Sequence, residues 1–336
     1  MKNTTVYDFI DSNSRKTIYL MILFFVSFVV VSYFIIILAG IIIGGEIYNC
    51  YDCDTNRSIF RMISGITTTS MLPIISVVAI IWIMVAYFAG KYFILSASGA
   101  SELTASNAPE IIHIVENIAI MSGLPIPKVY TINDNALNAF ATGRDPKHSY
   151  IVLTKGIIEK LEKTEIEGVI AHEMAHIKNR DTKLMLIAIV CIGFATTMSE
   201  LLLRYALTPR TRIKTNKNNT AQSFLFVFVI FFYIYGYLLA PLIKLAVSRT
   251  REFQADATAA FITRNPQGLI NALKKISNNS VVHRLNDKKI IAMICIANPL
   301  IQNKKRSIFL KISGLFATHP SIVDRIKALE SIGGYR

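Results

Sequence analysis

His172-Glu173-Met174-Ala175-His176 is the stretch that decides how this chain folds and what it does. Histidines four residues apart on an α-helix lie on one face, one turn apart, so both imidazoles can reach a single metal ion. The glutamate after the first histidine lies beside them, where its carboxylate can act as a base toward a water molecule. The stretch therefore predicts a helix that carries half of a zinc hydrolase site.

The residues before this motif predict where its helix begins. Thr164-Glu165-Ile166-Glu167 fits a capping box, in which a hydroxyl and a carboxylate bond to free amides of the first turn. This start lies eight residues before His172, so the motif is expected well inside the helix. The pattern also allows the helix to run on through Asn179 and Asp181 into a later hydrophobic segment.

The sequence upstream of the motif predicts a globular domain with a small sheet. Residues 111–121 have helical periodicity and end at a Ser-Gly pair. Residues 128–132 alternate like a strand, and residues 138–142 and 150–154 flank a turn, as in a β-hairpin. We therefore expect an α+β class, mainly helical, in this part of the chain.

Long uncharged segments predict that the chain crosses a membrane. Of its 336 residues, 52% are hydrophobic and 17% are charged, against roughly 25% charged in soluble domains. Four segments are long enough to approach or exceed the roughly 20 residues that cross a bilayer as a helix. They are residues 18–44, 67–90, 184–203 and 221–243.

These segments divide the expected catalytic domain in sequence. The organisation predicted is an N-terminal two-helix membrane anchor, the first half of the domain, the third and fourth hydrophobic segments, and the second half of the domain. The boundaries are residues 1–95, 96–183, 184–247 and 248–336. The third segment contains Glu200, and basic residues follow it, so a shallow hairpin remains open beside two full crossings.

Basic residues predict the orientation in the membrane. The net charge is +14, and residues 248–336 hold 15 Lys and Arg against 5 Asp and Glu. Basic segments stay on the cytoplasmic side, so we expect the catalytic domain and both termini in the cytoplasm, with the chain in the cell membrane. No stacking aromatics or binding motif accompany the lysines, so we expect the bilayer as partner and no nucleic acid.

A catalytic zinc needs a third protein ligand, and two glutamates compete for that role. Glu200 lies 24 residues after His176 but towards the far end of a hydrophobic segment. Glu252 lies 76 residues after His176 and begins a soluble helix. Asp256, one turn after Glu252, can orient an imidazole N–H. These arguments favour Glu252.

The combination of motifs resembles the HtpX-type membrane zinc metalloproteases, which are relatives of the CAAX prenyl proteases. Residues 172–181 match the family's HExxHxxNxD, residues 251–256 its third-ligand segment and residues 138–143 its edge-strand motif. The resemblance runs from about residue 107 to residue 336. It implies a gluzincin-type domain, one zinc per chain, and cleavage of damaged or misfolded membrane proteins in protein quality control and the stress response.

Roles follow for the residues that match. We expect His172, His176 and Glu252 to bind Zn²⁺, and Glu173 to take a proton from water and pass it to the leaving amine. Asp256 is expected to orient a histidine ligand.

Other residues have weaker assignments. Asn179 is expected to brace the helix of the motif, and His319 and Arg325 are candidates for stabilising a negative intermediate, with a structural role equally open. The strand of Asn138, Ala139, Phe140 and Ala141 is expected to bind an unfolded or membrane protein substrate as an added strand, although a purely structural hairpin is an alternative.

Two rival functions remain open from the sequence. A CAAX-type prenyl endopeptidase would need a larger intramembrane chamber than four segments easily build. A catalytically inactive membrane scaffold would have no need of Glu173. The favoured prediction is a membrane-bound, zinc-dependent endopeptidase.

Overall fold

The computed structural model describes eight stretches of the chain: residues 6–48, 53–207, 229–233, 235–236, 249–278, 282, 295–296 and 320–332. The chain divides into two compact units. One unit contains residues 1–17, 87–189 and 241–336, and the other contains residues 18–86 and 190–240.

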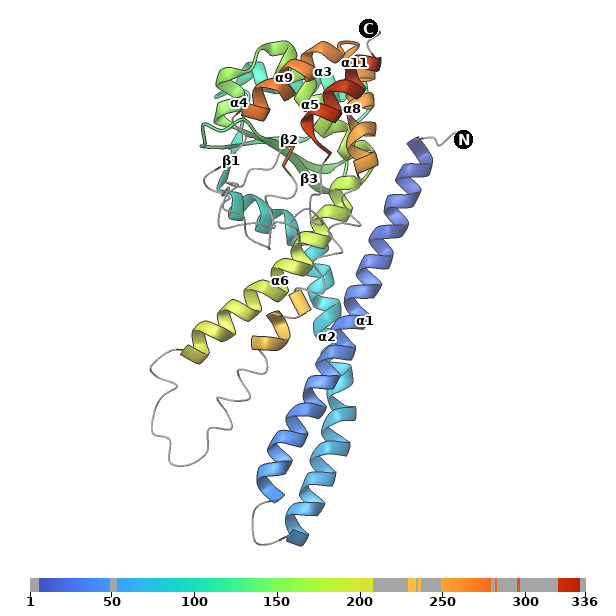
Figure 1. Ribbon diagram of the computed structural model, residues 1–336, viewed down its shortest axis with the longest axis vertical. Helices are drawn as coiled ribbons and strands as arrows, with labels where there is room; N and C mark the ends of the chain where they lie inside the picture. The colour runs from blue at the N-terminus through green and yellow to red at the C-terminus, as the bar shows by residue number, and fades with distance from the viewer. Residues whose placement is uncertain are drawn as a thin grey trace. The chain divides into compact units, whose positions relative to one another are not determined.

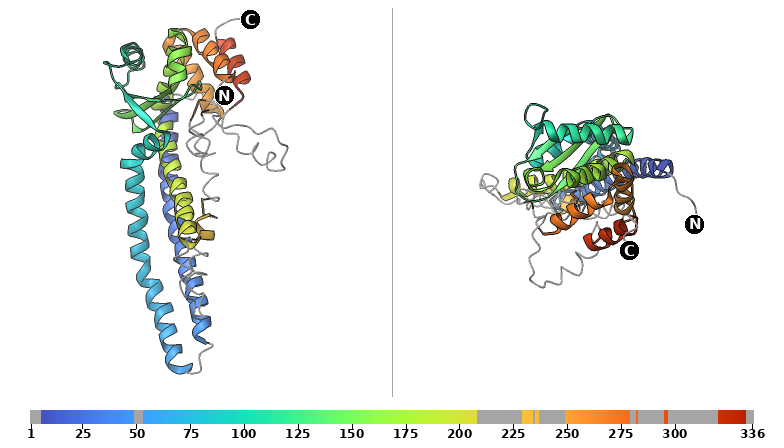
Figure 2. Two further views of the ribbon diagram at one scale, coloured as in Figure 1. Left: turned by 90° about the vertical axis from the view of Figure 1, so that its left-hand side faces the viewer. Right: turned by 90° about the horizontal axis from the view of Figure 1, so that it is seen from above.

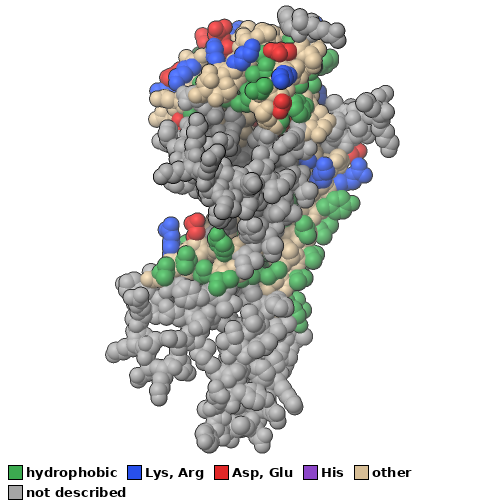
Figure 3. Space-filling model, viewed as in Figure 1, with side chains coloured by type: hydrophobic (Ala, Val, Ile, Leu, Met, Phe, Trp, Pro, Cys, Tyr) green, Lys and Arg blue, Asp and Glu red, His purple; other side chains and the backbone are tan. Residues whose placement is uncertain are grey.

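Three long apolar helices in the described part of the chain identify a membrane protein. They are α1 (Val6–Tyr48), α2 (Cys53–Ser98) and α6 (Asp181–Leu207), drawn in Figure 1. Each contains a segment able to cross a bilayer: Asp11–Tyr33, Leu72–Ser98 and Asp181–Arg204. Hydrophobic side chains gather along the exposed faces of α1 and α6 in Figure 3, as lipid contact requires.

The fourth expected segment, residues 221–243, falls largely outside the described residues. Its described part packs by aromatic contacts within its own unit. The Tyr235 ring lies 6.2 Å from Phe24 and 6.2 Å from Phe28, and its hydroxyl donates to the Phe24 carbonyl at 3.2 Å. The count of four crossings therefore stays a prediction.

A four-stranded mixed sheet lies in the other unit, in the order β1-β2-β4-β3. Its strands are β1 (Ala100–Leu103), β2 (Lys128–Ile132), β3 (Ala139–Asp145) and β4 (His148–Thr154). β2 pairs with β4 in parallel, whereas the β1–β2 and β3–β4 pairs are antiparallel. The predicted strand and hairpin are confirmed, and β3 forms one edge of the sheet.

Two details of the sheet differ from the expectation. The hairpin strands run longer, so only Pro146 and Lys147 lie between them. β1 was not predicted, because its exposed polar residues Ser101 and Glu102 hide the alternation of a strand.

Helices pack around one central helix, α5 (Lys163–Lys178), which carries the motif. It contacts α3 (Pro109–Ser122), α8 (Arg249–Thr263), α9 (Pro266–Asn278) and the strands β3 and β4. The short α4 (Lys155–Lys160) follows β4, and α11 (Ile322–Ile332) packs on α8 and α9, as seen from above in Figure 2. The predicted helix of residues 111–121 is confirmed as α3, which ends at Gly123 with φ 66°.

The start of α5 differs from the predicted capping box. Thr164 already lies inside the first turn, so it cannot cap. Instead the Glu165 carboxylate accepts the Glu162 backbone N–H at 2.8 Å, and Lys275 of α9 donates to the same carboxylate at 2.7 Å. The predicted capping box of Thr164 to Glu167 was therefore wrong by two residues, because the observed one runs from Glu162 to Glu165. Through Lys275, the observed capping box also connects α5 to α9.

The helix does not run on from the motif into the hydrophobic segment. α5 ends at Lys178, and Arg180 has a φ of 62°, in the left-handed region that an α-helix cannot continue through. α6 starts afresh at Asp181. The break turns the Asp181 side chain back toward the motif.

We expect Gly168→Ala to destabilise the domain. A Cβ at this position would lie 2.7 Å from the Leu269 nitrogen and 2.9 Å from its Cα, so α9 must move. Overpacking of this kind costs about 1–3 kcal/mol, more than the helix propensity gained from alanine. Thermal unfolding in detergent measures the loss, and Lys274→Ala on the exposed face of α9 is the control. Equal unfolding temperatures for Gly168→Ala and wild type would contradict the close approach.

Candidate metal centre

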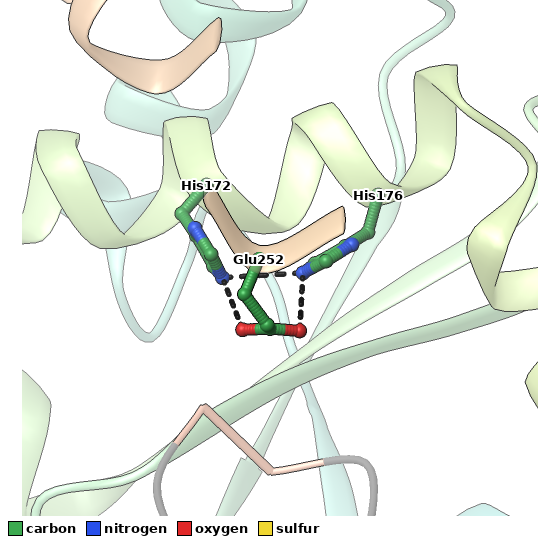
Figure 4. Close-up of side chains that lie close together, drawn as sticks. All are labelled: His172, His176 and Glu252. Carbon is green, nitrogen blue, oxygen red and sulfur yellow. Dashed lines mark hydrogen bonds and ion pairs between the residues drawn. The ribbon is translucent and has the colours of Figure 1, made fainter. Parts of the chain in front are cut away.

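Three side chains from two helices converge at one point. His172 and His176 come from α5 and Glu252 from the first turn of α8. Their Nε2 atoms lie 3.1 Å apart, and the Glu252 carboxylate oxygens lie 3.7 Å and 3.6 Å from those nitrogens (Figure 4). His172 and Glu252 are buried, and His176 is partly buried. These three are the group of described residues that could hold a metal ion.

Carboxylates behind the histidines fix which nitrogen carries the proton. Asp256 lies 3.0 Å from Nδ1 of His172, and Asp181 lies 3.0 Å from Nδ1 of His176. A carboxylate accepts hydrogen bonds, so each Nδ1 is the donor and each Nε2 keeps its lone pair. Two lone pairs and a carboxylate therefore face one another.

This arrangement fits a metal ion. Lone pairs and a carboxylate repel one another at these distances unless a cation lies between them. In a tetrahedral zinc site with bonds of about 2.0–2.1 Å, neighbouring ligand atoms are separated by about 3.3 Å. The separations of 3.1 to 3.7 Å agree with that value.

The electrostatics of the site favour positive charge. Burial lowers the pKa of His176, but the hydrogen bond that His176 donates to Asp181 and the charges of Glu252, Asp181 and Glu173 raise it to about 9. The carboxylates thus stabilise any cation at the imidazoles, whether a proton or a metal.

Glu173 follows His172 in α5, next to the three converging side chains, and its carboxylate has the properties of a base. Burial raises the pKa of its carboxyl group, and the charges of His172 and His176 act in the opposite direction. The backbone N–H of Ala141, in β3, donates to this carboxylate and so orients it. A carboxylate with a raised pKa accepts and returns a proton more readily near neutral pH.

Arg325 is buried and contacts the acidic residues around the histidines. Its Nε and Nη2 donate to the two oxygens of Asp256 at 2.8 Å and 2.7 Å, and its Nη1 lies 3.6 Å from Glu252. Burial would raise the pKa of Asp256, but Arg325 and His172 hold it below its usual value. These contacts hold Asp256 and Glu252 in place, and a role for Arg325 as donor to an intermediate stays a prediction.

The end of α5 is braced by residues that the sequence did not single out. The Asn13 side chain donates to the Asn179 carbonyl at 2.7 Å and to Asp181 at 2.8 Å, and Arg251 donates to Asp181 at 3.2 Å. Asn179 therefore contributes through its backbone at the end of the helix. Asn13 lies 166 residues away along the chain, so no local pattern could have shown the contact.

The remaining predicted residues have different outcomes. Glu252, rather than Glu200, reaches the histidines, and Glu200 lies exposed on α6. His319 lies outside the described residues. Asn138 and Ala139 to Ala141 lie at or on the edge strand β3, where the Ala139 carbonyl accepts the Ile296 backbone N–H at 2.8 Å.

We expect Asp256→Asn to weaken metal binding about 10- to 100-fold, because an amide no longer fixes the His172 tautomer as a carboxylate does. Competition with a zinc chelator measures the affinity. Asp324→Asn, an exposed change on α11, is the control, and thermal unfolding verifies that both variants fold. An unchanged affinity in folded Asp256→Asn would contradict this role.

Known proteins are similar to this chain over most of its length. The model of "Peptidase family M48" matches residues 105–333. A "Protease HtpX homolog" of Dictyoglomus turgidum is 36% identical over 342 residues, covering 99% of this chain and 97% of the relative. A "Protease HtpX homolog" of Bacteroides fragilis is 40% identical over 262 residues, covering 78% and 80%.

A solved structure was also found. The crystal structure of S. mikatae Ste24p aligns with a TM-score of 0.41 at 17% identity, covering 89% of this chain and 61% of that protein. The chain thus spans about three fifths of the length of that protein. The family model and the sequence relatives carry the comparison.

Proposed function

Because the chain belongs to peptidase family M48, we propose that it is a zinc-dependent endopeptidase that cleaves unfolded or damaged membrane proteins. That it is a membrane metalloprotease follows from its family and its apolar helices. The observation that carries the finer proposal is the convergence of His172, His176 and Glu252 beside a buried Glu173.

The residues of the site have complementary roles in this proposal. Bound by the two histidines and Glu252, Zn²⁺ would supply the Lewis acid that polarises a carbonyl and acidifies water. Glu173 takes the proton from the attacking water and returns it to the leaving amine, since its buried carboxyl group has a raised pKa. Asp181 and Asp256 hold the imidazoles in one tautomer throughout.

The edge strand supports a substrate of little sequence preference. β3 pairs with β4 on one side, and an extended peptide would bind on the other side by displacing Ile296 from the Ala139 carbonyl. Ala141 lies on this strand and donates to Glu173, so a peptide added here lies beside the base. Unfolded proteins offer such extended segments, which suits a role in quality control.

The charge distribution supports the orientation in the cell membrane. With residues 248–336 strongly basic, we place the catalytic unit and both termini on the cytoplasmic side. Residues 96–183 and 248–336 would then form one domain that the hydrophobic segments of residues 184–247 interrupt.

We expect Glu173→Gln to abolish cleavage of casein while zinc stays bound. The amide cannot accept a proton, and loss of a general base typically costs about 10²- to 10⁴-fold in rate. Activity of the zinc-loaded, detergent-purified protein is measured beside bound zinc. Glu159→Gln, an exposed change on α4, is the control, and a chelator added to wild type is a second one. Cleavage by Glu173→Gln equal to wild type would refute the proposed mechanism.

The contact of Ile296 with β3 gives a second test. Ile296 is buried, and its N–H occupies the Ala139 carbonyl that an added strand would use. Ile296→Pro removes this donor, whereas Ile296→Ala keeps it and loses the same side-chain packing.

We expect kcat/KM for casein to be about 2- to 10-fold higher in Ile296→Pro than in Ile296→Ala, the value of one hydrogen bond. Both variants must show the same thermal unfolding before their rates are compared. A folded proline variant that is no more active than the alanine variant would argue against substrate binding at this edge.

A further inference from the structure

A small pocket lies in the unit of residues 1–17, 87–189 and 241–336, which also contains the metal centre. The residues that line the pocket take no part in that centre. The pocket volume is about 40 Å³, and its lining residues are Tyr87, Phe88, Lys91, Arg144, His148 and Leu186. Since one water molecule needs a cavity of about 10–15 Å³, the pocket has room for roughly three water molecules. That is the size of a phosphate group.

Cations outnumber anions around this pocket. Lys91 donates to the Tyr150 hydroxyl at 2.6 Å, and Arg144 lies 5.1 Å from the Phe88 ring. Lys183 and Arg144 both approach the Tyr87 ring, at 5.4 Å and 5.8 Å.

The described lining of the pocket contains no acidic residue, and Asp145 is paired with two of the lining residues. It pairs with Arg144 Nε at 3.4 Å and with His148 Nδ1 at 2.9 Å. One carboxylate does not balance Lys91, Arg144 and Lys183, so the pocket favours an anion.

The sequence places these cations at the level of lipid headgroups. Residues 62–90 carry no charge, and Lys91 is the first charged residue after them. Lys183 is the last charged residue before the uncharged residues 184–199. Lys183 therefore lies near the start of the candidate span Asp181–Arg204, and Lys91 lies within the last third of the candidate span Leu72–Ser98, where its uncharged part ends. Charged residues that border an uncharged stretch in this way lie near the headgroups, and the two lysines share the neighbourhood of Tyr87.

Exposed aromatic side chains lie beside the cations. Phe88, which lines the pocket, is 54% exposed, and Tyr92 and Phe93 are 64% and 43% exposed. Aromatic rings at this depth contact acyl chains and headgroups. A ligand with a phosphate and an apolar part satisfies both kinds of contact, whereas a free ion satisfies only the first.

We propose that this pocket binds the phosphodiester of an anionic phospholipid, with Arg144 and Lys91 as its ligands. Arg144 lies at the irregular register between Gly143 and Asp145, near the end of β3. β3 also carries Ala141, whose N–H orients Glu173. Headgroup binding would thus hold the hairpin whose strand β3 orients Glu173.

The test titrates the full-length protein in a neutral detergent with three probes: dihexanoyl phosphatidylglycerol, dihexanoyl phosphatidylcholine and inorganic phosphate. Native mass spectrometry counts bound lipid, and the rise in unfolding temperature measures binding. We expect phosphatidylglycerol to bind about 10- to 30-fold more tightly than phosphatidylcholine, from two cations near the headgroup.

Matched variants locate the site. The double change Arg144→Gln with Lys91→Met should remove the preference, and Arg144→Lys alone should keep most of it. Lys155→Gln with Lys274→Gln removes two exposed cations elsewhere and should leave the preference unchanged.

Three results would overturn the proposal. They are equal binding of the two lipids, an equal loss in the control double variant, and inorganic phosphate binding as tightly as the anionic lipid. The last result would identify a site for the free ion. If the Arg144 and Lys91 double variant does not fold, Arg144→Gln alone, compared with Arg144→Lys, decides between the outcomes.

Discussion

The lone pairs of two imidazoles and the carboxylate of Glu252 are held facing one another, and the catalytic unit is built around that unfavourable contact. The helices α5 and α8 bring the three groups together, with nitrogens 3.1 Å apart. Such a cluster is stable only if a cation neutralises it. The packing of the two helices, which carry much of the core, therefore depends on what occupies the space between these side chains.

The buried charges behind the ligands form a connected set. Arg325 is fully buried and contacts both Asp256 and Glu252, while Asp256 contacts His172. Each of these groups would be costly to bury alone, and together they satisfy one another. α11 and α8, which lie far apart in sequence, are thus joined through the site as well as through apolar packing. A guanidinium in this setting holds geometry, because its hydrogen bonds point at fixed oxygens.

Much of the site could be predicted from sequence, because its central element is local. Histidines at i and i+4 on a helix must share a face, and the fixed spacing also places Glu173. Glu252 needed an argument about burial, since 76 residues separate it from His176. Contacts such as Asn13 with Asp181 could not be predicted, because they arise from tertiary packing between segments with no shared pattern.

The short strand, the start of one helix and the number of membrane crossings were harder to predict. The hairpin and α3 have clear turn and periodicity signals, whereas β1 has only four residues and an exposed polar face. The start of α5 was misplaced because several neighbouring glutamates and a threonine can each cap a helix. The glutamate that bonds to the free amide, Glu165, also accepts from Lys275 of another helix, a contact that no local pattern shows. The number of membrane crossings depends on residues 221–243, of which only a part is described.

Because the helix breaks at Arg180, Asp181 has two structural roles. It is the first residue of the membrane helix α6, and it is also the acceptor that holds the ring of His176. The same carboxylate accepts hydrogen bonds from Asn13 and Arg251. The tautomer of His176, the end of α5 and the start of α6 therefore depend on one side chain, so a substitution of Asp181 would disturb all three together.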